Sequence, residues 1–141
     1  MARFLLLAVG SLLLIFGLHT LAFRYLGWAP EMSGLERYGL AAAAPPAPSF
    51  VLGFWLLQIL ALIALYLIVQ GRSGSWWLDG LMAAWIAWIF RGPVLVLTLE
   101  ALTRLPRDPW WPLSLRWFVL YTVCGLVQAF LGRPRRAAPE I

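Results

Sequence analysis

The chain has 141 residues, of which 62% are hydrophobic and only 12% are charged. A soluble domain carries about twice that charged fraction, so the composition excludes an ordinary water-soluble globule, a disordered chain and a coiled coil. The single cysteine, Cys124, excludes an intramolecular disulfide and a multi-cysteine zinc or iron–sulfur site. We therefore expect one all-α integral membrane domain over residues 1–141, in contact with membrane lipids and without a metal site.

The basic residues are all arginine, eleven in number against six acidic residues. Most of them lie between or just beyond apolar runs, which is typical of membrane edges and predicts no nucleic-acid partner. The densest cluster falls in a basic tail, residues 133–141. The lack of lysine beside abundant arginine, alanine and glycine is typical of a GC-rich genome, and we expect a bacterial inner (cytoplasmic) membrane.

Three of the apolar segments predict straightforward membrane spans, because a bilayer core needs about 20 helical residues. Residues 4–23 and 49–70 are uncharged throughout. Residues 112–132 form a span if Arg116 extends its guanidinium toward the headgroups. No small-x-small cleavage site follows the first segment, so we expect a retained helix instead of a signal peptide.

The segment over residues 76–102 is interrupted at Arg91-Gly92-Pro93. Proline removes a backbone donor and crowds the carbonyl four residues earlier, so the helix should kink or stop there. Either it ends at Phe90 and the chain returns along the surface, or one long kinked helix continues. The stretch over residues 94–99 is apolar on nearly every side, whereas an interfacial helix needs a polar face, which favours the continuous helix. That arrangement places Arg91 near the middle of the membrane.

The largest extramembrane piece is the loop over residues 24–48, in which Pro30 and Glu31 favour the start of a short interfacial helix. Four spans place both ends of the chain on one side of the membrane. The arginines divide evenly between the two sides, but Arg3 and the basic tail lie close to span ends. We therefore expect both termini in the cytoplasm.

Arg91 is the strongest candidate for a functional side chain. Trp85, Trp88 and Arg91 follow one another at three-residue spacing and share one helix face, which Trp77 extends about four turns away. We expect Arg91 to stack on Trp88 and to bind an anionic group. A lipid phosphate, a carboxylate of a partner subunit and a quinone oxygen are the candidates, and pairing with a partner's acid is favoured over a small molecule.

Other polar and small residues carry weaker expectations. Glu100 is spaced to pair with Arg104, at four residues along the helix. His19, the only histidine, is a candidate axial ligand for haem or a chlorophyll-type pigment, although a hydrogen-bonded interfacial histidine is the simpler interpretation. Gly125 and Ala129 form a small-xxx-small pair that permits close helix packing.

The sequence contains no catalytic constellation, so we do not expect an enzyme. We also expect no intrinsic cofactor. The leading hypothesis is a non-catalytic accessory subunit of a larger membrane complex, such as a respiratory or photosynthetic one, which packs against partner subunits, lipids or bound cofactors. The alternative is a small ligand-binding or transport protein for an anionic amphiphile or a quinone, with Trp85, Trp88 and Arg91 in the pocket. An enzyme of lipid metabolism ranks third, because no general base accompanies Arg91.

Overall fold

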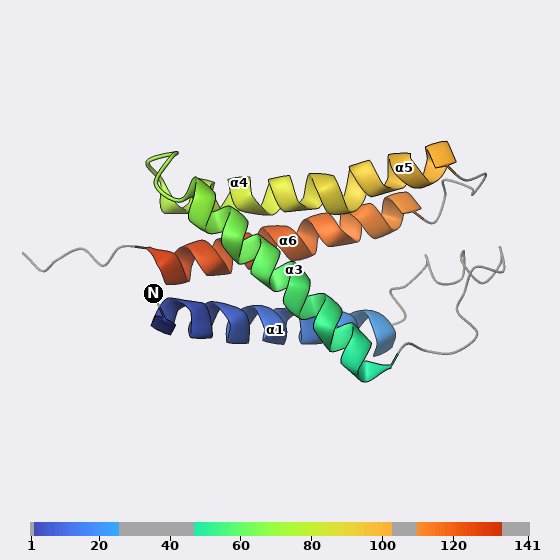
Figure 1. Ribbon diagram of the computed structural model, residues 1–141, viewed down its shortest axis with the longest axis horizontal. Helices are drawn as coiled ribbons and strands as arrows, with labels where there is room; N and C mark the ends of the chain where they lie inside the picture. The colour runs from blue at the N-terminus through green and yellow to red at the C-terminus, as the bar shows by residue number, and fades with distance from the viewer. Residues whose placement is uncertain (1, 26–46, 103–109, 134–141) are drawn as a thin grey trace, which may run out of the picture.

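The computed structural model describes residues 2–25, 47–102 and 110–133, and nearly all of them are helical. The predicted interfacial helix falls within residues 26–46, and most of the basic tail lies beyond residue 133, so both predictions lie outside the described residues. Figure 1 shows the arrangement of the helices. Their bounds are α1 (Ala2–Tyr25), α3 (Pro48–Val69), α4 (Trp76–Ile89), η1 (Phe90–Val94), α5 (Leu95–Leu102) and α6 (Trp110–Gly132).

Four helical stretches are long and apolar enough to cross a membrane, which confirms the expected all-helical class at this level. They are Ala2–Ala22, Pro48–Val69, Trp76–Leu102 and Trp110–Gly132. Large apolar side chains remain exposed around the bundle, among them Leu6, which is 76% exposed, and Leu57, which is 66% exposed. Such a surface suits lipid better than water.

The third long helix is continuous, as the second of the two predicted arrangements had it. α4 passes into α5 through a single turn of π-helix, η1, which contains Pro93. A π-helical turn is wider than an α-helical turn, and it therefore accommodates both the missing proline N–H and the crowding of the carbonyl at Ile89. The interruption predicted from the sequence is thus a local change of helix type.

α6 is the central helix of the bundle and contacts α1, α3, α4, η1 and α5. α3 crosses the bundle and packs against both α1 and α4, whereas α1 and α4 do not touch within the described residues (Figure 1). The largest fully buried side chains are mostly apolar or aromatic and come from α1 and α3, and α6 adds Gln128 and Cys124. They include Leu12, Phe16, Ile59, Leu62 and Tyr66.

α4 and α6 approach each other through small residues. A Cβ atom added to Gly80 would lie 2.5 Å from the carbonyl oxygen of Gly125 and 2.6 Å from the Cβ of Ala129, and one added to Gly125 would lie 2.6 Å from the Cβ of Ala84. The small-xxx-small pair that the sequence indicated on α6 therefore packs against a second such pair, Gly80 and Ala84, within the same chain. Close packing of this kind is a main source of helix association in membranes.

Asp79 holds the turn between α3 and α4. Its carboxylate accepts hydrogen bonds from the Gly71 N–H at 2.6 Å, from the Ser73 N–H at 3.0 Å and from the Ser73 hydroxyl at 2.7 Å. The turn needs Gly71 and Gly74 because both have positive φ, 81° and 74°. Asp79 is only 3% exposed, but these donors satisfy its charge, so its role is structural.

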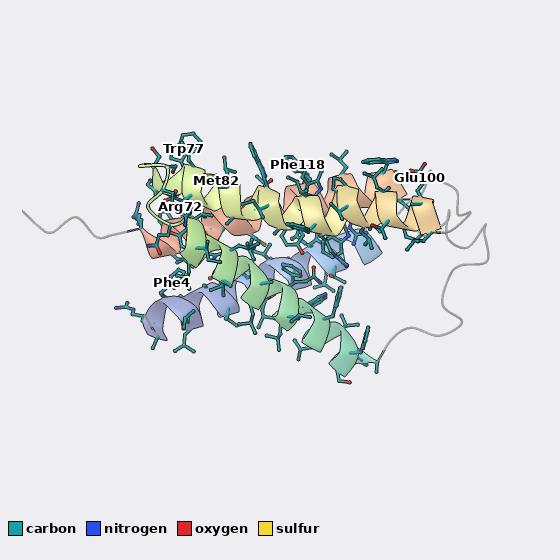
Figure 2. All side chains as sticks on the ribbon, turned by 45° about the horizontal axis from the view of Figure 1, so that its top comes forward. Phe4, Arg72, Trp77, Met82, Glu100 and Phe118 are labelled. Atoms are coloured by element: carbon teal, nitrogen blue, oxygen red, sulfur yellow. The ribbon has the colours of Figure 1, made fainter. Side chains whose placement is uncertain are left out.

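The two ends of the bundle are distinguished by the helices that begin and end there. α1 begins and α6 ends at the same end as the α3–α4 turn, which we call the turn end (residues 70–75) (Figure 1). The opposite end, where α5 ends and α6 begins, we call the α6-start end (residues 102 and 110). In Figure 2, Phe4 and Arg72 lie at the turn end and Glu100 lies at the α6-start end.

Candidate functional site

Arg91 lies in η1 and extends its guanidinium between α3 and α6. The guanidinium carbon lies 4.7 Å from the ring centroid of Phe54 on α3 and 4.8 Å from that of Trp117 on α6. A cation in this position over an aromatic face is attracted by about 0.5–2 kcal/mol, more where water is excluded. The predicted stacking partner, Trp88, was therefore wrong: Arg91 stacks on two rings from neighbouring helices.

Trp88 is not free to stack on Arg91 because it is held by α6. Its ring meets that of Phe118 edge to face at 4.9 Å, and its indole N–H donates to the Ser114 carbonyl oxygen at 2.8 Å. Gly92 permits this contact, since a Cβ atom there would collide with the Ser114 hydroxyl and lie 2.8 Å from the Trp88 indole nitrogen. Trp88 and Arg91 both turn toward α6, but each has its own partners there.

The Arg91 side chain is not neutralised within the described part of the chain. Its Nε atom is buried and has no hydrogen-bond partner there. Aromatic faces attract the positive charge, but they do not cancel it, and a buried unsatisfied donor costs about 1–3 kcal/mol, more on a charged group. Of the acids on the same helix, Asp79 is engaged in the turn and Glu100 lies nine residues farther on. Arg104, the predicted partner of Glu100, lies outside the described residues.

A small, partly open pocket of about 30 Å³ lies beside Arg91, between the segment η1–α5 and the first turns of α6. Its apolar wall consists of Leu95, Val96, Leu113 and Trp117. A site of this volume holds two or three oxygen-sized atoms, because one water needs about 10–15 Å³ by the same measure. The pocket therefore fits a compact polar group and is too small for a ring system.

Two further polar residues from α6 line the same pocket. The Trp110 indole nitrogen and the Ser114 hydroxyl oxygen are both buried, and neither has a hydrogen-bond partner within the helices that the structure describes. Ser114 is 2% exposed, so its hydroxyl has no alternative access to water. Arg91, Trp110 and Ser114 thus each line the pocket, and each carries one unpartnered polar atom within the described chain. Two of them only donate hydrogen bonds and the hydroxyl is able to donate one, which suits an acceptor oxygen.

The remaining tryptophans predicted for the site do not reach this pocket. Trp85 is 45% exposed and stacks on Phe118 with ring centroids 6.2 Å apart. Trp77 is also 45% exposed and lies near Met82 toward the turn end (Figure 2). The structure therefore brings Trp88 and Arg91 together at α6, whereas Trp77 and Trp85 stay on the outside of α4.

Sequence reasoning missed the contribution of α6. Trp110, Ser114 and Trp117 follow one another at spacings of four and three residues, which places them on one helix face. This spacing was visible in the sequence, but nothing indicated that the face is opposite Arg91. Trp117 begins the third turn of α6, about 10 Å from the helix start, so on α6 the site lies nearer the α6-start end. The expectation that Arg91 lies near the middle of the membrane stays a prediction.

His19 lies beside this site and contacts α6. Its Nε2 atom accepts a hydrogen bond from the Arg116 Nε–H at 3.3 Å, and its ring lies 6.1 Å from that of Trp117. A nitrogen that accepts this bond is not available to a haem iron or a pigment magnesium in the same arrangement. The cofactor-ligand hypothesis for His19 stays a prediction. In the described helices no three metal-binding side chains of His, Cys, Asp or Glu come together.

The chemical interpretation of the site rests on its geometry. No protein-family model, no curated protein and no solved structure matches this chain. The arrangement is a cation stacked on aromatic rings, with unpartnered donors around a small pocket near the start of a long helix. Such a site is suited to binding an oxyanion.

Proposed function

We propose that this chain is a membrane-embedded binding protein for an anionic amphiphile, whose acidic group is held by Arg91. The observation that carries the proposal is the buried Nε atom of Arg91, which has no hydrogen-bond partner within the described chain although it lies beside an open pocket. Desolvation of a guanidinium is costly unless an anion compensates it. An acid delivered from the membrane supplies both the negative charge and the missing acceptor.

An acidic amphiphile is favoured over a quinone by charge and by volume. A quinone carbonyl accepts hydrogen bonds but leaves the guanidinium charge uncompensated. A quinone ring also exceeds the pocket of about 30 Å³, whereas a carboxylate, or two or three oxygens of a phosphoryl group, fits it. The accessory-subunit hypothesis, in which the acid belongs to a partner subunit, stays a prediction. The walls of the pocket come from this chain's own α5 and α6, which favours a head group over a partner's helix.

Replacing Arg91 with glutamine is expected to abolish binding of a long-chain fatty acid to the purified protein. The change removes the charge and the unpartnered donor while it retains a side chain of similar length, so we expect affinity to fall about 100-fold or more. Equilibrium binding of radiolabelled oleate to the full chain in a neutral detergent measures the effect. The Arg72→Gln variant removes an equal charge at the exposed turn end and should bind oleate normally.

Thermal unfolding of the same variants separates a binding role from a structural one. Because Arg91 has no acid partner in the described chain, its neutral replacement should leave the ligand-free protein about as stable as before. Oleate should raise the unfolding midpoint of the unchanged protein but not that of the Arg91→Gln variant. Equal oleate affinity in both proteins would overturn the proposal. Extraction in mild detergent as a stable assembly with other subunits, together with loss of that assembly on Arg91→Gln, would favour the accessory-subunit hypothesis.

We infer further that the chain lies in a bacterial cytoplasmic membrane with both termini in the cytoplasm. Arg3 in the first turn of α1, Arg72 in the α3–α4 turn and Arg133 after α6 all belong to the turn end of the bundle (Figure 1). An excess of arginine near span ends marks the cytoplasmic side. A green fluorescent protein fused after residue 141 should therefore fluoresce, and an alkaline phosphatase fused at the same position should stay inactive. The reverse pattern would place the turn end outside the cytoplasm.

A further inference from the structure

We propose that Arg91, Trp110 and Ser114 together form a specific receptor for a compact terminal oxyanion, a carboxylate or a phosphomonoester, at the end of an acyl chain. This inference rests on the proposed function and deepens it, because it names two further binding residues and the class of head group. Trp110 and Ser114 are connected to Arg91 through the pocket that all three residues line.

The donors around the pocket match the acceptors of a terminal oxyanion. The Arg91 Nε–H and the Trp110 Nε1–H only donate hydrogen bonds, and both are buried without a partner in the described chain. The Ser114 hydroxyl is likewise unpartnered, although the residue is 98% buried. A carboxylate or phosphoryl group has two or three acceptor oxygens on one centre, so one such group carries acceptors enough for these atoms.

The Ser114 hydroxyl is the most informative of the three atoms. Its own backbone carbonyl already accepts the Trp88 indole N–H at 2.8 Å, so the residue is firmly positioned through its main chain. The hydroxyl adds nothing to that contact, and burying it without a partner costs about 1–3 kcal/mol. A ligand that accepts a hydrogen bond from this hydroxyl would remove that cost. Thr122 on the same helix also has a buried, unpartnered hydroxyl, but it does not line the pocket, and it therefore serves as a control.

The location and size of the pocket define how the ligand is presented. Trp110 begins α6, so the head group is held within the first turns of that helix, where the helix dipole favours negative charge. The pocket of about 30 Å³ admits a terminal group but excludes a second substituent, such as a further glycerol or sugar, on the far side of that group. Exposed apolar side chains beside it, Leu95 at 39% and Val94 at 42%, leave a surface along α5 for the acyl chain.

The test uses the purified full chain, with binding of radiolabelled oleate and competition by unlabelled lipids. Trp110→Phe retains an aromatic ring without the N–H, and Ser114→Ala removes only the hydroxyl. Each variant should weaken oleate binding about 10- to 100-fold, as expected for one lost hydrogen bond to a charged group. The matched controls, Trp111→Phe at an exposed neighbour and Thr122→Val at the other orphaned hydroxyl, should bind oleate as tightly as the unchanged protein.

Competition identifies the head group. Phosphatidic acid, which carries a phosphomonoester, should displace oleate, whereas phosphatidylglycerol, a phosphodiester with a bulky head group, should compete at least tenfold less well. Displacement by phosphatidic acid alone, with weak direct binding of oleate, would assign the phosphomonoester as the ligand; equal binding would assign both. If Arg91→Gln abolishes binding but Trp110→Phe, Ser114→Ala and the head-group exchange have no effect, the proposed function stands and this inference is overturned.

Unfolding of the ligand-free variants excludes a trivial loss of structure. Ser114→Ala removes a hydroxyl that has no partner in the described chain, so the ligand-free protein should be as stable as before or slightly more stable. Reduced binding together with an unchanged unfolding midpoint supports direct contact with the ligand. Reduced binding together with a lowered midpoint in both variants would assign Trp110 and Ser114 a structural role and overturn the inference.

Discussion

Replacing Gly125 with leucine is expected to lower the free energy of unfolding by about 3 kcal/mol or more, at the upper end of what overpacking costs. A Cβ atom at this position would collide with the Gly80 carbonyl oxygen and lie 2.6 Å from the Cβ of Ala84. The obstacle is backbone, which no change of rotamer removes. α4 and α6 must therefore separate, and the contact between them is the most extensive in the bundle.

Thermal unfolding of the purified protein in detergent, followed by circular dichroism, measures this effect. Gly53→Leu is the matched control, because Gly53 lies within α3 and a Cβ atom added there meets nothing within 4 Å. That variant should unfold at the same temperature or slightly higher, since leucine has the greater helix propensity. A Gly125→Leu variant as stable as Gly53→Leu would show that α4 and α6 do not pack closely. Loss of oleate binding by Gly125→Leu is also expected, since α6 carries Trp110 and Ser114.

The helices were predictable because lipid imposes a strong and simple constraint on the backbone. A helix that crosses hydrocarbon must be long and apolar, and the four such segments stand out in the sequence without reference to their partners. The continuity of the third helix through Pro93 was also predictable, since the residues after it are apolar on every side. The π-helical form of that turn was not, because it depends on how neighbouring helices hold the backbone around Arg91 and Gly92.

The candidate site was predictable only in part. An arginine within an apolar helix stands out by its charge, and Arg91 was found in this way. Its partners were not found, because Phe54, Trp110 and Ser114 lie on other helices, and the relative rotation of two apolar helices leaves little trace in one sequence. The nearly uniform apolar character of α3 and α6 means that neither helix shows which face is inside. Proximity along the helix suggested that Trp88 stacks on Arg91, but Trp88 packs against α6 instead.

Replacing Asp79 with alanine is expected to lower the free energy of unfolding by about 3 kcal/mol. The carboxylate accepts three hydrogen bonds from Gly71 and Ser73, two of them from backbone N–H groups of the α3–α4 turn. Each orphaned buried donor costs about 1–3 kcal/mol, and water reaching the turn end reduces the sum. Asp79→Asn retains an acceptor oxygen for part of the set and should lose about half as much stability.

Unfolding midpoints in detergent test this second effect, with Ser75→Ala as its control. Ser75 precedes α4 as its N-cap, but its side chain makes no capping hydrogen bond. Its removal should therefore change the free energy of unfolding by no more than about 0.5 kcal/mol. Because Asp79 lies in the first turn of α4 and Arg91 lies about three turns farther along the same long helix, Asp79→Ala should leave oleate affinity unchanged at temperatures where the variant is folded. An equal loss of binding and stability would instead show that the turn end and the Arg91 pocket are coupled through α4. A stable Asp79→Ala variant would mean that water satisfies the turn, and that this acid is retained for a reason other than its hydrogen bonds.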